Sequence, residues 1–365
     1  MSDTLKILVI NPGGTSTKIA AFENGSKLFL EDVRHSSDEL SNFKTVLEQN
    51  SWRLDLVRKK VAEHNMSMES FDAIVGRGGP VVPVPSGTYI IDEPMLDAIF
   101  SGRVMIDHPS LLGATIAFEL AQTAGCPAFI VDPVCVDEFI DEARLTGLPQ
   151  IPRRALSHTL SVKAAARKAA LELGLDFYKS NFVVLHLGSG FTVAVQKNGR
   201  QIDATDASAS GPMSPTRAGS MPALDMAVFC LSQKKTLAEM KKLLVGGSGW
   251  MAHLGTDDVR EIYKRIDNND SKAKLVLDAT LLQLAKETAG MFSVLKGEVN
   301  AIILTGGVTR SQRFTEALKT RLAWLKTSVI VQSGENEMSA LARGAVRAVN
   351  KNPAARSMEP YIEKN

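Results

Sequence analysis

Short, nearly continuous hydrophobic runs alternate along this chain with longer segments in which hydrophobic positions recur every three or four residues. The short runs predict buried strands, because a strand covered by helices on both faces has no polar side. We expect such strands at Lys6–Asn11, Ala73–Val75, Ala128–Asp132, Phe182–His186, Ala301–Thr305 and Ser328–Gln332. The longer segments predict helices at Ser37–Gln49, Leu54–His64, Pro109–Thr123, Leu160–Leu173, Thr236–Leu244, Thr256–Asn268, Ser271–Val294, Arg310–Leu325 and Glu337–Val349. This alternation predicts an α/β fold.

The opening strand pattern occurs twice in the chain. Lys6–Gly14 and Asn181–Gly190 each read as a hydrophobic strand that ends in a glycine-bearing turn. An Asn-Gly pair follows each of them at nearly the same distance, at Asn24-Gly25 and Asn198-Gly199. Asn-Gly is a strong hairpin signal, because both residues adopt positive φ readily. The repeat predicts two homologous domains, and we expect a nucleotide in the cleft between them.

The same pattern suggests where the domains divide. We expect an N-terminal domain at residues 1–157 and a C-terminal domain at residues 158–336, followed by a helix at 337–350. The polar stretch 351–365 contains two prolines and is expected to be a surface tail.

Composition and charge exclude several classes of protein. The 365 residues are 44% hydrophobic and 22% charged, with a formal net charge of +2 and no basic stripe, so we expect no nucleic-acid partner. No hydrophobic stretch reaches the ~18 residues that a membrane span needs, and the N-terminus has no secretory signal pattern. Three widely spaced cysteines fit neither a disulfide framework nor a metal site. We therefore expect a cytoplasmic protein without a membrane partner.

Glycine-rich turns at strand ends are the candidate phosphate sites. Gly13–Lys18 combines two glycines, three hydroxyls and an ammonium group, all of which suit phosphate oxygens. It is not a Walker A loop, and a plain glycine-rich hairpin explains it equally well. Gly188-Ser189-Gly190 is the counterpart in the second copy, and Gly306-Gly307 lies between a strand and a helix, where α/β sheets commonly bind ligands. A tight strand-to-helix connection is the alternative for the last turn.

These turns belong to a longer series of motifs that resembles one family. Val9–Lys18 looks like the opening signature of the acetate/butyrate kinases, a family of the actin, hexokinase and Hsp70-type ATPase superfamily. Further segments resemble the butyrate-kinase branch in order, namely Val75–Gly79, Pro83–Tyr89, Phe129–Val134, Gly211–Gly219, Ile303–Gly307 and Gly334–Met338. The resemblance implies two actin-like (ribonuclease H-like) α/β domains, with the C-terminal helix at 337–350 returning to complete the N-terminal domain. It also implies reversible, Mg²⁺-dependent transfer of a phosphoryl group from ATP to a short-chain fatty acid, giving an acyl phosphate, by a homodimer or larger homo-oligomer.

The resemblance also implies roles for individual residues. Arg77 and Arg217 would hold the carboxylate and the transferring phosphoryl group, a task that suits the planar, permanently charged guanidinium. His108 and His158 would donate hydrogen bonds to the reacting oxygens, and Asp132 would orient the metal–water or arginine network. ATP would contact Asn11, Gly13, Thr15, Ser16, Lys18, His186, Gly188, Gly190, Gly306 and Gly307. Mg²⁺ would bind Glu337 and Asp132, with Glu335 as the alternative to Glu337.

Several positions depart from the family pattern and leave the acyl-chain preference open. Gly14 stands where a serine is usual, Ser157 replaces an aromatic residue of the acyl pocket, and Thr216 replaces a glutamate. The residues after His108 also differ. The acceptor is therefore expected to be butyrate or a related straight or branched acid. A catalytically silent ATP-binding regulator is the alternative; a sugar kinase fits less well, because it needs an aspartate base to activate a hydroxyl.

Overall fold

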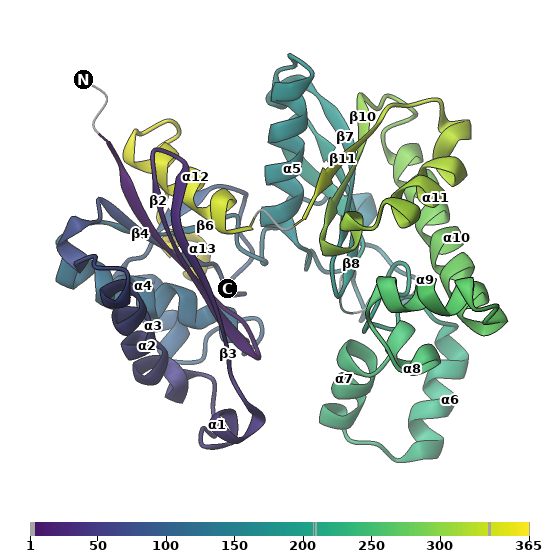
Figure 1. The fold of residues 1–365 in the computed structure, drawn as a ribbon, viewed down its shortest axis with the longest axis horizontal. Helices are drawn as coiled ribbons and strands as arrows, with labels where there is room; N and C mark the ends of the chain where they lie inside the picture. Colours follow the sequence, from purple (N-terminus) through teal and green to yellow (C-terminus); the bar gives the residue numbers. More distant parts are fainter. Residues whose placement is uncertain (1–3, 207, 209, 335–336, 365) are drawn as a thin grey trace. The chain divides into compact units, whose positions relative to one another are not determined.

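A computed structural model of the chain describes residues 4–206, 208, 210–334 and 337–364, which form two compact units (Figure 1). Unit 1 contains the residues up to Asp137 together with the C-terminal segment that begins at α12, and unit 2 contains the residues from Glu138 to Gly334. The expected boundary lay later, between residues 157 and 158. The segment before His158 instead packs within unit 2, where Arg153 donates hydrogen bonds to Asp203 Oδ1 (2.8 Å) and the Ala204 carbonyl (2.7 Å).

Unit 1 is built on a six-stranded sheet of order β3-β2-β1-β4-β6-β5. The strands are β1 (Lys6–Pro12), β2 (Ser16–Glu23), β3 (Ser26–Arg34), β4 (Ala73–Arg77), β5 (Thr88–Ile90) and β6 (Ala128–Val131). The first three strands form antiparallel hairpins, β4 and β6 run parallel to β1, and β5 is an antiparallel edge strand. Asn24 and Gly25 both have positive φ, so the Asn-Gly pair makes the expected hairpin turn.

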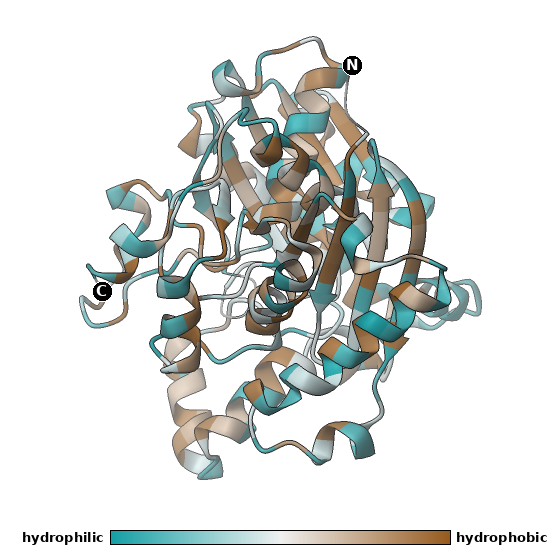
Figure 2. Cartoon of the chain, turned by 90° about the vertical axis from the view of Figure 1, so that its left-hand side faces the viewer, coloured by the Kyte–Doolittle hydropathy of each residue, from teal (hydrophilic) through white to brown (hydrophobic). Residues whose placement is uncertain are grey.

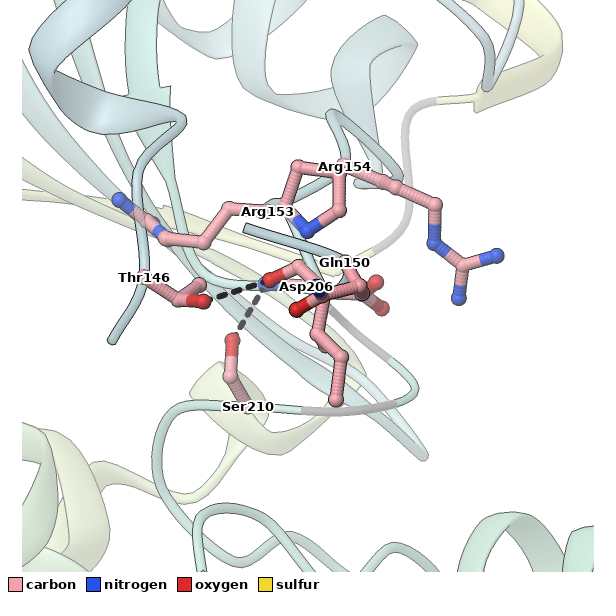
Figure 3. Close-up of a pocket in the computed structure, with 8 residues that line it drawn as sticks. Thr146, Gln150, Arg153, Arg154, Asp206 and Ser210 are labelled. Carbon is pink, nitrogen blue, oxygen red and sulfur yellow. Dashed lines mark hydrogen bonds between the residues drawn. The ribbon is translucent and has the colours of Figure 1, made fainter. Parts of the chain in front are cut away.

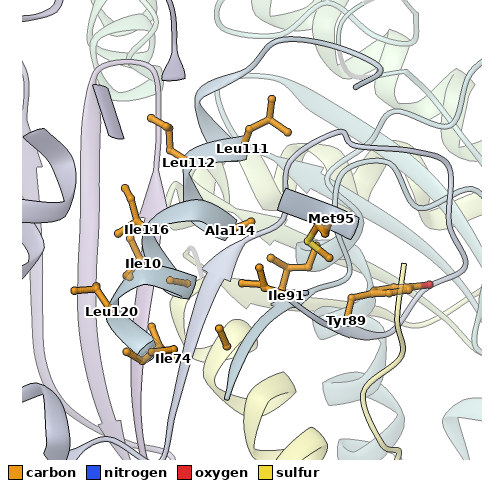
Figure 4. Packing of buried hydrophobic residues seen from close by; sticks show 14 of the residues in the cluster. Ile10, Ile74, Tyr89, Ile91, Met95, Leu111, Leu112, Ala114, Ile116 and Leu120 are labelled. Carbon is orange, nitrogen blue, oxygen red and sulfur yellow. The ribbon is translucent and has the colours of Figure 1, made fainter. Parts of the chain in front are cut away.

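Helices cover both faces of the central strands β1, β4 and β6, which is why these strands are largely hydrophobic. The helices of unit 1 are α1 (Ser37–Ser41), α2 (Asn50–Glu63), α3 (Glu93–Phe100), α4 (Leu112–Ala124), α12 (Glu337–Val349) and α13 (Glu359–Ile362). α4 packs on β1, β4 and β6, and Figure 4 shows Ile116 and Leu120 from this helix beside Ile10 and Ile74 of the sheet. α12 packs against the same three strands and buries its small residues.

The C-terminal stretch differs from the expected surface tail. Met358 is completely buried and Ile362 is nearly so, and both belong to the hydrophobic core of unit 1. Arg356 also forms a β-bridge with Tyr89 of the edge strand. These residues fill space beside α3, so apolar burial outweighs the polar character of the stretch.

Unit 2 repeats the strand topology of unit 1. Its sheet has the order β11-β10-β7-β8-β9, formed by β7 (Asn181–Leu187), β8 (Phe191–Lys197), β9 (Arg200–Ala204), β10 (Ala301–Gly306) and β11 (Val329–Ser333). β7, β8 and β9 are consecutive antiparallel strands, and β10 and β11 extend the sheet in parallel from β7. Asn198 and Gly199 again have positive φ. The two-domain repeat expected from the sequence is therefore confirmed at the level of topology.

Alternate residues of the unit 2 strands enter different cores. Val183 and Leu185 join one hydrophobic cluster, whereas Phe182 and Val184 join the other. α5 (Thr159–Glu172) packs on β7, β8 and β10, and α10 (Ser271–Val294) packs on β7, β8 and β9. The remaining helices of unit 2 are α6 (Ala223–Gln233), α7 (Leu237–Gly246), α8 (Trp250–Leu254), α9 (Val259–Asp267) and α11 (Gln312–Leu322). The hydropathy of the chain follows this arrangement. In Figure 2, many strands are coloured as hydrophobic, whereas the helices carry both hydrophobic and hydrophilic residues.

Most predicted elements are present, with one clear exception. The helix expected at Ser37–Gln49 is divided into the short α1 and a 3-10 turn at Leu47–Gln49. α1 carries a complete capping box, in which Ser36 Oγ accepts from the Glu39 amide and Glu39 caps the Ser36 amide. It buries no residue, so no packing extends it. In the part of the chain that the structure describes, no helix is long and hydrophobic enough to cross a membrane.

Candidate functional site

The turn between β1 and β2 places the first group of predicted residues in unit 1. The Gly13 amide donates to the Ser16 carbonyl (2.7 Å) and closes the turn, with Gly14 and Thr15 exposed at its tip. Asn11 and Lys18 are cross-strand partners just behind the turn. The turn leads into a strand rather than a helix, as expected.

Asn11, Arg77 and Glu337 come together although they are far apart in the sequence. Asn11 Nδ2 donates to Glu337 Oε2 (3.0 Å), and Arg77 Nη1 lies 3.5 Å from Glu337 Oε1. Glu337 is the first residue of α12, where the helix dipole stabilises a carboxylate. Arg77 is only 6% exposed. The structure thus gathers a guanidinium, a carboxylate and an amide at the ends of β1 and β4.

Two glycines set the position of Arg77. A Cβ on Gly76 would lie 1.9 Å from the Gly113 carbonyl oxygen, and a Cβ on Gly113 would lie 2.3 Å from the Arg77 carbonyl oxygen. α4 therefore touches the backbone of β4 directly at the arginine. This close approach holds the end of β4 against a rigid helix.

Asp132 follows β6, one residue beyond the cross-strand partner of Arg77. Its φ of 38° is uncommon for a non-glycine residue. The strained conformation is held by Gly87, whose amide donates to Asp132 Oδ1 (2.8 Å) and whose carbonyl accepts from the Asp132 amide (2.8 Å). Asp132 is 1% exposed, so it is an anchored carboxylate at the same sheet edge as Arg77.

His108 caps the 3-10 turn Pro109–Leu111 in unit 1. Its Nδ1 accepts from the Ser110 amide (3.2 Å), which leaves the ring proton on Nε2 in the neutral form. Gly79 allows the loop after Arg77 to meet this turn, since a Cβ there would lie 2.7 Å from the Leu111 amide nitrogen. The residues after His108 that depart from the family pattern therefore form the turn that His108 caps.

In unit 2, His158 and His186 form a stacked pair. Their ring centroids are 4.4 Å apart with an interplanar angle of 26°. His158 precedes α5, and its Nδ1 lies 2.9 Å from Thr192 Oγ1. Thr192 is in turn the cross-strand partner of His186. The structure thus joins the two predicted histidines and adds Thr192, which the sequence did not indicate.

Arg217 lies against the second glycine turn. A Cβ on Gly190 would be 2.3 Å from Arg217 Cζ, so only glycine leaves room for the guanidinium. The Ser189 carbonyl accepts from Ser214 Oγ (2.8 Å) and from the Thr216 amide (3.2 Å), which fastens the turn to the Arg217 loop. Burial lowers the pKa of Arg217, and nearby Asp206 opposes this shift. Thr216, one of the departures, contributes a second contact to Ser189 through its hydroxyl.

Gly306 and Gly307 form the strand-to-helix turn after β10. Gly306 has φ 99°, and a Cβ there would lie 2.5 Å from the Leu187 carbonyl oxygen. Gly307 and Gly188 line a pocket of about 490 Å³ within unit 2. The other lining residues are Ser189, Pro215, Asp257, Asp258, Val259, Arg260, Val308, Arg310 and Ser311. This volume suits a small ligand.

The sequence reasoning missed the polar wall of this pocket. Asp257, Asp258 and Arg260 lie at the start of α9, and Arg260 Nε donates to Asp258 Oδ1 (2.9 Å). Two adjacent aspartates in the first turn of the expected helix Thr256–Asn268 were a usable signal, but they also suit an ordinary N-cap, which Asp258 provides by accepting from the Arg260 amide through Oδ1 (2.8 Å).

A second pocket in unit 2, of about 460 Å³, contains none of the predicted residues (Figure 3). Arg153 lines it, but its guanidinium is engaged by Asp203 and by the Ala204 carbonyl. Ser210 Oγ accepts from the Asp206 amide (2.9 Å). These side chains serve the local fold.

The remaining expectations concern Ser157 and the metal ligands. Ser157 is buried in a polar network, in which its hydroxyl accepts from Gln201 Nε2 (2.8 Å). Glu335 lies outside the described residues. Within the described ranges, no group of three or more His, Cys, Asp and Glu side chains is arranged to hold a metal. Glu337 and Asp132, the two predicted metal ligands among the described residues, both lie in unit 1.

Comparisons with known proteins agree with these motifs. A sequence model of the acetokinase family matches residues 150–348. "Probable butyrate kinase 2" of Caldanaerobacter subterraneus subsp. tengcongensis is 43% identical over 94% of this chain and 97% of its own length. "Probable butyrate kinase" of Listeria monocytogenes is 42% identical over 94% and 96%. The crystal structure of Porphyromonas gingivalis acetate kinase shares the fold, with a TM-score of 0.75 at 19% identity over 94% of this chain and 99% of that one. The chain belongs to the acetokinase family.

Proposed function

We propose that this chain transfers the γ-phosphoryl group of ATP to a short-chain carboxylate and so forms an acyl phosphate and ADP. A carboxylate oxygen forms the new bond to phosphorus, while the bond from the γ-phosphorus to the bridging oxygen breaks and leaves its electrons on ADP. The carboxylate is already ionised at neutral pH, so no base needs to remove a proton. The reaction is reversible, because an acyl phosphate can return its phosphoryl group to ADP.

The burial of Arg77 and the missing hydrogen bond of its Nη1 are the observations that carry this proposal. Arg77 is 6% exposed, and its Nη1 makes no hydrogen bond among the described residues, although Glu337 lies 3.5 Å away. A buried guanidinium nitrogen without a hydrogen bond is costly unless a ligand completes it. A carboxylate matches the guanidinium fork in charge and shape. Arg77 is therefore our candidate to bind the acceptor acid, with His108 as a second donor.

The candidates in unit 2 would serve the nucleotide and the moving phosphoryl group. Gly188, Gly190 and the pocket beside Gly307 support a nucleotide, and the curated relatives of the chain carry the name of kinases. His158, His186 and Arg217 offer hydrogen-bond donors and positive charge, which is the main protein contribution to phosphoryl transfer. In unit 1, Asn11, Gly13, Thr15, Ser16 and Lys18 are proposed to contact phosphate oxygens of ATP.

Mg²⁺ is the proposed metal cofactor. When bound, it would neutralise charge on the phosphate oxygens. Glu337 fits as its carboxylate ligand, because Mg²⁺ in such enzymes keeps several waters and takes only one or two carboxylates from the protein. Asp132 is the second candidate, anchored through one oxygen by Gly87. Arg77 and Asn11 would hold Glu337 in place for that role.

We propose butyrate or a related straight or branched acid as the acceptor. The curated relatives at 42–43% identity carry the name butyrate kinase. Ser157 and the residues after His108 depart from the family pattern, so the acyl group would have different surroundings in this chain. We also propose that the protein is a homodimer or larger homo-oligomer.

No comparison favours the alternative of a catalytically silent regulator.

The experiment is a panel of C2 to C6 acids, straight and branched, incubated with the protein, ATP, Mg²⁺ and hydroxylamine. Acyl phosphate reacts with hydroxylamine, so we expect acyl hydroxamate from butyrate or a near analogue, together with an equal amount of ADP. Arg217→Ala should abolish the product while ATP binding remains, because the arginine is proposed to act on the moving group. Absence of hydroxamate across the whole panel would contradict the function, and full turnover by Arg217→Ala would remove that residue from the mechanism.

A further inference from the structure

A fully buried cation lies directly behind the β1–β2 turn of unit 1. Arg53, on α2, is 0% exposed. Its Nε and Nη2 donate to Gln49 Oε1 (3.1 and 2.8 Å), and its Nη1 donates to the Ser16 carbonyl (3.2 Å) and to Thr17 Oγ1 (2.8 Å). All of these acceptors are neutral. In the described part of the chain, Arg53 forms no ion pair with a carboxylate.

This arrangement needs a physical explanation. Buried charges are normally paired, because removing an ion from water costs far more than its neutral hydrogen bonds return. Burial lowers the pKa of Arg53 to about 10, so the guanidinium is still charged at neutral pH. Unit 1 therefore carries a buried positive charge whose counter-charge is not among its described partners.

The turn in front of Arg53 is arranged to accept an anion. The Ser16 carbonyl receives both the Gly13 amide and Arg53, and the Thr15 carbonyl receives the His35 amide (2.9 Å), so these two carbonyls are engaged on the protein side. The exposed amides of Gly14 and Thr15 donate no hydrogen bond within residues 4–206, 208, 210–334 and 337–364. Adjacent open amides in a glycine turn bind anions.

We propose that Arg53 is a positioning residue for a phosphate group bound on the Gly13–Ser16 turn. It orients the turn by holding the Ser16 carbonyl and the Thr17 hydroxyl, and the bound phosphate supplies the counter-charge that the buried guanidinium lacks. Arg53 does not touch the phosphate. The identity of that phosphate as part of ATP rests on the proposed function, but the need for an anion does not.

The test compares Arg53→Met, Arg53→Lys and the control Arg58→Met in the full-length protein. Arg58 lies on the same helix, is exposed and pairs with Asp55 at 3.6 Å. We expect Arg53→Met to weaken ATP binding and raise the KM for ATP on the order of tenfold, the size expected for one charge on the order of 10 Å away at an intermediate dielectric. The KM for the acid should change less than twofold. Arg53→Lys, which keeps a cation without the fork, should lie between wild type and Arg53→Met, and Arg58→Met should match wild type.

A purely structural role for Arg53 would give a different result. Arg53→Met would then lower the melting temperature and leave the KM for ATP unchanged, or would raise both KM values equally, and either outcome overturns the proposal. If Arg53→Met does not fold, inorganic tripolyphosphate is added to wild type and Arg53→Lys. The melting temperature of wild type should rise more than that of Arg53→Lys, and equal rises overturn the proposal. This measurement needs no acceptor acid. It therefore tests the role of Arg53 even if phosphoryl transfer itself is not observed.

Discussion

At the scale of residues, one hydroxyl joins Arg53 to a neutral histidine. Arg53 Nη1 donates to Thr17 Oγ1, and the same hydroxyl shares a hydrogen bond with His35 Nε2, 2.8 Å away. His35 is 7% exposed and packs on Trp52. Burial, and then the positive charge of Arg53, lower the pKa of His35 below its usual value, while Glu39 partly opposes the shift. The folded chain therefore favours the unprotonated imidazole.

This shift predicts a loss of stability in acid. Above about pH 6.5, His35 is neutral in both the folded and the unfolded chain and contributes no pH dependence. As the pH falls from there toward the lowered pKa of the folded state, the unfolded chain binds a proton that the folded chain does not, which costs up to about 1.4 kcal/mol per pH unit. Urea unfolding of wild type and His35→Gln between pH 7.5 and 5 measures this. The variant should have the shallower slope, and equal slopes would contradict the prediction.

Residue chemistry explains how much of the site the sequence could predict. Arg77, Arg217 and the glycine turns stood out through their motifs, but their roles remain proposals. Arg53 lies one residue before the predicted helix Leu54–His64, and nothing in the spacing shows that its side chain is buried. Thr192 was equally hidden, because its contact with His158 depends on strand register.

At the scale of elements, the contact between α4 and β4 depends on two glycines. Gly113→Ala should displace α4, since the new methyl group would lie 2.3 Å from the Arg77 carbonyl oxygen. Overpacking of this kind costs about 1–3 kcal/mol, and here it would also move Arg77. Gly290→Ala is the matched control in α10, where a Cβ meets no atom within 4 Å, and it should stabilise the helix by up to about 1 kcal/mol. Melting temperatures and the KM for the acid measure both effects; an unchanged KM in Gly113→Ala would contradict the link to Arg77.

The fold was predictable wherever hydrophobic periodicity and turn chemistry agreed. α10 and α12 have the predicted bounds, and both Asn-Gly pairs form the predicted turns. The helix expected at Ser37–Gln49 failed because its pattern had no core to pack against. α6 was missed for a related reason, since it buries none of its residues and shows no clear two-sided pattern.

At the scale of the whole molecule, unit 1 is assembled from two distant parts of the chain. Deleting residues 337–365 removes α12, which covers one face of β1, β4 and β6. We expect the amides of β1 and β4 to lose protection from hydrogen exchange, while those of β7 and β10 keep it. Deleting only 351–365 keeps α12 but removes the buried Met358, so it should destabilise unit 1 by roughly 2–5 kcal/mol without unfolding it. Retained protection of β1 in the longer deletion would contradict this prediction.

The late position of α12 has a consequence for how the protein is made. Unit 2 is continuous in sequence and can fold as soon as β11 has left the ribosome. The central strands of unit 1 are synthesised first, but α12, which covers one of their faces, follows only after unit 2. At ordinary rates of translation, these hydrophobic strands wait roughly tens of seconds for their cover. During that interval, we expect the face of β1 and β4 that α12 later covers to be open to contact with a chaperone.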